Sequence, residues 1–157
     1  MVGFDGNGYY YRQEENHYLI APYTSNQEGS CIDDGLLNSR KVIEQLKGKL
    51  GEIWNYKNAE IHRNMQAIAL QLNTYPWNFD IVPCFHTIDN FYLIPNGNGK
   101  WERTDPRIDN ERTKRLNQKF KEHLLELIRL VKYLNARKLT ITLSSYLLVV
   151  IILNFYD

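Results

Sequence analysis

An apolar stripe with helical spacing, within residues 110–135, constrains the fold of this chain more than any other feature. Its apolar residues recur at intervals of three and four, the period of a helix that packs one face against a core. Polar and charged residues fill most positions between them. The spacing predicts one long helix over 110–135. The stripe consists of Leu116, Phe120, Leu124, Leu127, Ile128, Val131 and Leu134.

Two further segments have helical character. Residues 36–54 show the same period, and Asp33 or Asp34 stands where a cap would begin that helix. Residues 144–155 are apolar on nearly every side, which predicts a largely buried helix. The apolar run ends at Asn154 and is far shorter than the ~20 residues that cross a bilayer, so no membrane partner is expected.

Short apolar runs separated by turn residues predict strands. Residues 67–72 and 77–82, joined by 73–76, are typical of a β-hairpin. Residues 91–95 predict a further strand, followed by a tight turn. Residues 1–35 are rich in Gly, Asn and Tyr without a sustained period, which predicts loop with one short strand at most.

Together these elements predict an α+β fold. The chain has 157 residues, of which 43% are hydrophobic, a globular composition that excludes wholly disordered classes. We expect one compact unit, with a helix and strands in residues 1–109 and helices in residues 110–157. Two cysteines are too few for a disulfide framework, and the first residues show no secretory leader. The expected location is the cytoplasm.

Asp80 is the candidate catalytic residue, because it stands inside an apolar, strand-like run over 78–83. Alternation predicts Phe79 and Ile81 on one side of the strand and Asp80 on the other. A charge displayed from a rigid sheet needs a partner or a cation. The spacing leaves a second interpretation open, an aspartate wetted at the margin of the sheet.

Three residues near the end of the chain are candidates for nucleotide binding. Lys132 lies beside the apolar stripe, where an ordinary surface lysine with a buried stem is the alternative. Ser145 and Tyr146 open the last helical segment, where Ser144 and Ser145 are equally suited to act as caps.

Taken together, five motifs resemble, in order and separation, the bacterial cyclic-oligonucleotide synthases, relatives of animal cyclic GMP-AMP synthase and oligoadenylate synthetase. The resemblance covers about residues 36–156. The motifs are Phe79-Asp-Ile-Val-Pro83, Tyr92-Leu-Ile-Pro95, Gly99-Lys-Trp101 with Thr104-Asp-Pro106, Leu127-Ile-Arg-Leu-Val-Lys-Tyr133, and Ser144-Ser-Tyr146.

The resemblance implies a polymerase-β-like nucleotidyltransferase core with a long spine helix, here the segment 110–135. In that family three carboxylates hold two Mg²⁺ or Mn²⁺ ions, and Asp80 matches the third carboxylate. Because we identify one of the three here, we expect metal binding by this chain to be weak or absent. Lys132 matches the lysine that approaches the triphosphate, and Ser145 and Tyr146 match the pair that contacts phosphate and the base. Leu147 departs from the family, which often has histidine there.

The family also carries a Gly-Ser helix start and paired carboxylates upstream of these motifs, and we identify neither here. Gly29-Ser30 precedes Asp33 and Asp34 too closely, and no strand carries these acids at alternate positions. We therefore predict a member truncated at both ends, with nucleoside triphosphates as ligands and little or no transferase activity as an isolated chain. Full-length relatives make second messengers for defence against phage.

Two alternatives remain open. The first is a non-catalytic module that binds a nucleotide or nucleic acid, because residues 100–138 hold twelve of the nineteen basic residues against six acidic ones. The second is a partner chain that supplies the carboxylates absent here.

Overall fold

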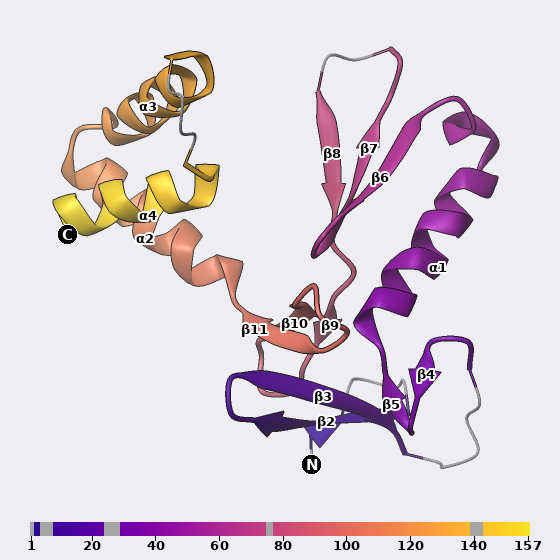
Figure 1. Ribbon diagram of the computed structural model, residues 1–157. Coiled ribbons are helices and arrows are strands. Elements are labelled where there is room, and N and C mark those ends of the chain that lie inside the picture. The colour runs from indigo at the N-terminus through magenta and orange to yellow at the C-terminus, as the bar shows by residue number, and fades with distance from the viewer. Residues whose placement is uncertain (1, 4–7, 24–28, 75–76, 139–142) are drawn as a thin grey trace. The chain divides into compact units, whose positions relative to one another are not determined.

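The computed structural model describes residues 2–3, 8–23, 29–74, 77–138 and 143–157. The chain divides into two compact units, Met1–Thr104 and Asp105–Asp157, where the sequence predicted one. Their boundary lies close to the predicted division between residues 109 and 110. The fold mixes helices and sheets, as expected for the α+β class (Figure 1).

The first unit contains an antiparallel sheet in the order β1-β2-β3-β11-β10-β9. The β2–β3 hairpin corrects the prediction of a loop with at most one strand over residues 1–35. Its signal is hidden because β3 is buried at four successive positions and so does not alternate. The strands are β1 (Val2–Gly3), β2 (Tyr9–Glu14), β3 (His17–Pro22), β9 (Phe85–His86), β10 (Tyr92–Pro95) and β11 (Trp101–Thr104).

Trp101 is at the centre of the core of this unit, with 0% of its surface exposed. Its indole Nε1 donates a hydrogen bond of 2.9 Å to the backbone oxygen of Leu37, in the hairpin β4 (Ile32–Asp33) and β5 (Leu36–Leu37). The Phe85 ring packs edge-on against Trp101, with centroids 5.1 Å apart. The other buried members of the cluster are Tyr11, Ile20, Cys31, Leu37, Phe91 and Leu93.

The helix α1 (Ser39–Glu52) begins later than the predicted start at residue 36. Asn38 caps it, not Asp33 or Asp34: its Oδ1 accepts a 2.9 Å hydrogen bond from the amide of Arg40. The Asn38 amide also donates to Asp33 at 2.8 Å, and Lys41 forms an ion pair with Asp33. Asp33, which lies in β4, therefore stabilises the start of the helix by holding the cap residue Asn38.

A second, three-stranded sheet follows the short 3₁₀ helix η1 (Trp54–Tyr56). It contains β6 (Glu60–Asn64), β7 (Ala67–Gln71) and β8 (Asn78–Ile81) in that order. The predicted hairpin is confirmed, with Leu70 opposite Phe79, although part of its 73–76 connection lies outside the described residues. Strand β6 was not predicted, because Ile61 is its single apolar residue. In the ribbon, α1 runs beside this sheet (Figure 1).

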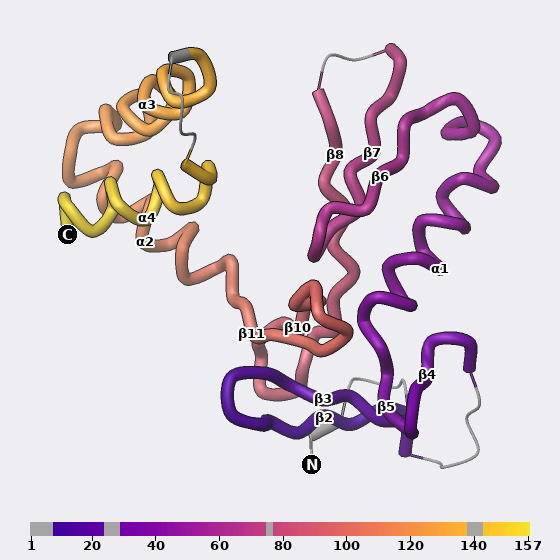
Figure 2. Tube along the Cα trace, viewed as in Figure 1, coloured from indigo at the N-terminus to yellow at the C-terminus, as the bar shows by residue number. Residues whose placement is uncertain are grey.

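The second unit consists of α2 (Pro106–Lys119), α3 (Leu124–Lys138) and α4 (Ser145–Tyr156), traced in Figure 2. The prediction of one helix over 110–135 is wrong, because the chain turns between α2 and α3, where Lys121 and Glu122 have positive φ. Asn117 holds this turn. Its Oδ1 accepts from the Leu125 amide at 3.0 Å, and its backbone oxygen accepts from the Glu122 amide at 2.8 Å.

The core of the second unit is small and contains Leu116, Leu124, Ile128 and Leu153. The predicted burial of the last helix is wrong: within α4, Leu148 and Leu153 are buried, whereas Phe155 is 81% exposed. Three helices of this length offer too little surface to cover an element that is apolar all round. In the described part of the chain, no helix is long and apolar enough to span a membrane.

Candidate functional site

The sheet β6–β7–β8 has two different faces. Ile61 of β6 and Leu70 of β7 are paired residues on the face toward α1, where Arg63 of β6 also forms an ion pair with Glu44 of the helix at 3.1 Å. The other face is polar and open, and we call it the open face. It presents Glu60, Gln71 and Asn78 in one row across the strands, and His62, Ala69 and Asp80 in the next.

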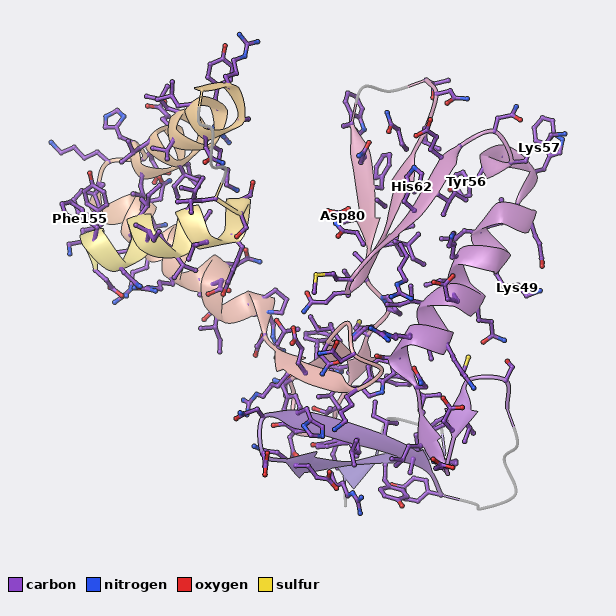
Figure 3. All side chains as sticks on the ribbon, viewed as in Figure 1. Lys49, Tyr56, Lys57, His62, Asp80 and Phe155 are labelled. Carbon is purple, nitrogen blue, oxygen red and sulfur yellow. The ribbon has the colours of Figure 1, made fainter. Side chains whose placement is uncertain are left out.

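Asp80 lies on β8 in the row with Ala69 and His62, and its side chain is exposed (Figure 3). The predicted alternation is confirmed, because Phe79 pairs with Leu70 on the other face. Among the described residues, no hydrogen bond or ion pair to Asp80 is formed. A regular strand thus fixes the backbone of this carboxylate, and its oxygens are open to a ligand.

His62 was missed by the sequence reasoning, since β6 reads as a polar loop. Its Nε2 lies 3.4 Å from the Glu60 carboxylate, and both side chains are exposed. The small side chain of Ala69 separates His62 from Asp80 in their row and adds no bulk above the sheet. The pairing of β6 with β7, rather than any motif, brings the imidazole to this face.

The open face meets part of what Mg²⁺ requires. Magnesium prefers oxygen ligands such as carboxylates, and Asp80 offers one of them. In the stretches that the structure describes, no three His, Cys, Asp or Glu side chains are arranged to hold a metal ion. The described residues therefore fit one position of a magnesium site.

The predicted nucleotide-binding residues belong to the second unit. Lys132 lies in α3 with a half-buried side chain, and Ser145 is the first residue of α4. The cap interpretation is confirmed for Ser144, whose Oγ accepts a 3.2 Å hydrogen bond from the Leu147 amide. A binding role for Ser145 and Lys132 stays a prediction.

Tyr146 is 66% exposed, and its hydroxyl donates a hydrogen bond of 3.3 Å to Asp109 of α2. The negative charge of Asp109 raises the pKa of the Tyr146 phenol, and partial burial and this hydrogen bond act in the same direction. The phenol therefore keeps its proton to a higher pH than an ordinary tyrosine does. The hydrogen bond holds the hydroxyl next to Asp109, and most of the side chain remains accessible.

Comparisons with known proteins bear on the part of the chain that carries Asp80. The sequence model of the Second Messenger Oligonucleotide or Dinucleotide Synthetase domain matches residues 33–117, which include the sheet β6–β7–β8. A probable cyclic nucleotide synthase of Bacillus cereus (strain VD146) is 44% identical over 164 residues, with all of this chain and 49% of that protein aligned. The chain spans about half the length of this curated relative. The resemblance found in the motifs is confirmed: the chain belongs to the Second Messenger Oligonucleotide or Dinucleotide Synthetase domain family.

Proposed function

We propose that this chain is part of a nucleotidyltransferase that joins nucleoside triphosphates into a cyclic oligonucleotide second messenger. The observation that carries the proposal is the family match over residues 33–117, which includes a sheet with an exposed carboxylate on its open face. We further propose that the first unit is part of a polymerase-β-like core, and that the messenger serves defence against phage.

Asp80 is assigned the role of metal ligand. A Mg²⁺ or Mn²⁺ ion, when bound, would neutralise the triphosphate and make the attacking ribose hydroxyl more acidic. Asp80 contributes a negatively charged oxygen from a strand paired at all four of its positions, so its backbone does not have to reorganise on binding. The open surface beside Ala69 leaves room for the phosphates.

We assign nucleotide binding to residues of the second unit. Lys132 would pair with the triphosphate, Ser145 would donate its hydroxyl to phosphate, and Tyr146 would stack on the base. The exposed ring of Tyr146 supports the last role, because an accessible aromatic face can stack on a base.

The isolated 157-residue chain should convert little or no substrate. Two-metal phosphoryl transfer requires several converging carboxylates, and Asp80 is the one that the described residues supply. Incubation with the four nucleoside triphosphates and Mg²⁺ or Mn²⁺ should give no product above background. Robust cyclic or linear product would contradict this part of the proposal.

A chimera tests the role of Asp80 directly. In it, this chain replaces the matched half of the Bacillus cereus relative, which is similar enough for the exchange. The Asp80→Asn variant should lose product formation by about 100-fold or more, since a metal carboxylate becomes a neutral amide. Glu60→Gln, on the same face, is the matched control and should retain activity. Equal activity of both variants would contradict the assignment.

A non-catalytic nucleotide- or nucleic-acid-binding module is the second candidate, favoured by the basic residues between 100 and 138. This candidate would be supported if nucleotide binding were sensitive to salt and abolished by Lys132→Ala, and if the chimera showed no turnover.

A further inference from the structure

A cleft of about 390 Å³ lies in the first unit, between the C-terminal half of α1, the 3₁₀ helix η1 and the start of β6. This volume is within the range of small-molecule sites. Ile61 lines the cleft, whereas its neighbour His62 belongs to the open face, so the cleft and Asp80 are on opposite faces of the sheet. Its lining residues are Glu44, Lys47, Gly48, Gly51, Tyr56, Lys57, Ala59 and Ile61.

The cleft has an excess of positive charge. Lys47 and Lys57 line it, and within the described part of the chain neither forms an ion pair with a carboxylate. The one acidic residue of the lining, Glu44, is paired with Arg63 at 3.1 Å. Lys49, on the same helix, is instead paired with Glu52 at 2.9 Å and does not line the cleft. Two lysines without an ion pair therefore make the lining of the cleft favourable to an anion.

The helix side of the cleft is bare backbone at Gly48 and Gly51. A Cβ built on either glycine would meet no atom within 4 Å, and neither has a positive φ. Neither close packing nor backbone conformation therefore requires glycine at these two positions, although glycine destabilises a helix interior. The lining therefore combines helix backbone without side chains with the uncharged residues Tyr56, Ala59 and Ile61.

We propose that this cleft binds a nucleotide, with its phosphate at Lys47 and Lys57 and its base against Gly48 and Gly51 beside Tyr56. An uncharged surface without side chains, next to two lysines, complements a ligand that is planar at one end and anionic at the other. The inference does not rest on the proposed function, because it uses neither Asp80 nor a metal ion.

The first experiment measures AMP and ATP binding to the chain by calorimetry in EDTA, which removes metal-dependent binding at Asp80. Both nucleotides should bind, and adenosine and inorganic phosphate should each bind about tenfold more weakly, because each lacks one half of the recognition. Asp80→Asn and Lys132→Ala, at the residues proposed to contact the metal ion and the triphosphate, should each leave the affinity for AMP unchanged. Absence of nucleotide binding, or equal binding of inorganic phosphate, would overturn the proposal.

Substitutions then locate the site. Lys47→Ala and Lys57→Ala should each weaken AMP binding by about fivefold to tenfold and reduce its salt dependence. Lys49→Ala is the matched control, since Lys49 lies on the same helix outside the cleft, and its affinity should stay within about twofold. If Lys49→Ala weakens binding as strongly as the other two, general attraction to the helix explains the result and the proposal fails.

A cavity-filling pair gives the sharpest test. Gly48→Leu should abolish binding by placing a side chain in the cleft, whereas Gly48→Ala should preserve it, and both should raise the helicity of α1. Far-ultraviolet circular dichroism verifies that both variants fold. AMP binding that survives Gly48→Leu, or binding of single-stranded oligonucleotides without binding of AMP, would overturn the proposal.

Discussion

The two units of this protein differ in how completely they bury their apolar residues. In the first, residues from Tyr11 to Trp101 converge on one core, and Trp101 itself is fully buried. In the second, four buried residues form the core, and α4 leaves Leu147, Ile151 and Phe155 largely exposed. Strand pairing joins distant parts of the chain and closes a core, whereas three short helices from consecutive sequence do not.

The largest expected effect concerns the centre of the first unit. Trp101→Ala should lower the free energy of unfolding by about 3–5 kcal/mol, because it removes a fully buried ring. Denaturant unfolding measures this change. Trp54→Ala, at a tryptophan that is 79% exposed, is the control and should change the value by less than about 0.5 kcal/mol. Equal effects of both variants would contradict a core centred on Trp101.

The corresponding substitution in the second unit should have a smaller effect. Leu153→Ala should cost about 2–3 kcal/mol, because the site is buried but its small core collapses easily. Hydrogen exchange of the α2 and α3 amides should accelerate. Ile151→Ala, on the exposed part of the same helix, should leave exchange unchanged. If Ile151→Ala destabilises as much as Leu153→Ala, the exposed face of α4 is covered in solution.

The turn between α2 and α3 gives the next test. Asn117→Ala should cost about 1–3 kcal/mol, since it leaves the Leu125 amide without its acceptor. Thermal unfolding measures the loss. The neighbouring Gln118→Ala should be nearly neutral because its side chain is exposed. A neutral Asn117→Ala would indicate that the two helices continue as one, as the apolar stripe alone predicts.

The caps of α1 and α4 allow the two units to be compared by the stability that each cap contributes. Asn38→Ala should cost about 1–2 kcal/mol, because Asn38 caps α1 and also donates to Asp33. Ser144→Ala should cost about 0.5–1 kcal/mol, since Ser144 makes the cap bond to Leu147 alone. Unfolding of both variants under the same conditions checks the order, and a reversed order would contradict the described caps.

The smallest expected effect depends on pH. A hydrogen bond from Arg112, with the positive charges of Arg112 and Arg115, lowers the pKa of the Asp157 carboxyl. A carboxyl with a lower pKa in the folded state stabilises the fold at pH values above its ordinary pKa near 4. This stabilisation is lost as the pH falls through the folded-state pKa. Asp157→Asn should therefore reduce stability at pH 6 and have a progressively smaller effect as the pH falls below about 4. A loss that stays equal over this range would contradict the ion pairs.

The sequence predicted elements whose signal is local. The β7–β8 hairpin, strand β10 with the turn that follows it, and the segments of α1 and α4 are confirmed, because turn residues and apolar periods mark each of them. The β2–β3 hairpin carries no such mark, since burial on both faces removes alternation. The turn at Lys121 and Glu122 was missed because the apolar stripe continues across it with unbroken spacing.

The candidate site was predictable to the same extent. Alternation places Asp80 on the side of β8 opposite Phe79, and the register confirms it. His62 reaches the same face through the pairing of β6 with β7, which depends on partners that a polar strand does not reveal. The cleft beside Gly48 was not predicted, because it arises where α1, η1 and β6 come together in space.

The central claim is that the carboxylate of Asp80 on the open face binds a divalent metal ion together with a nucleotide. Paramagnetic broadening of backbone amide signals by Mn²⁺, measured by NMR on the chain in the presence of ATP, tests it most directly. Broadening should centre on β8 and the adjoining residues of β7, disappear in Asp80→Asn and persist in Glu60→Gln. Broadening that is unchanged in Asp80→Asn, or that centres outside this sheet, would contradict the claim.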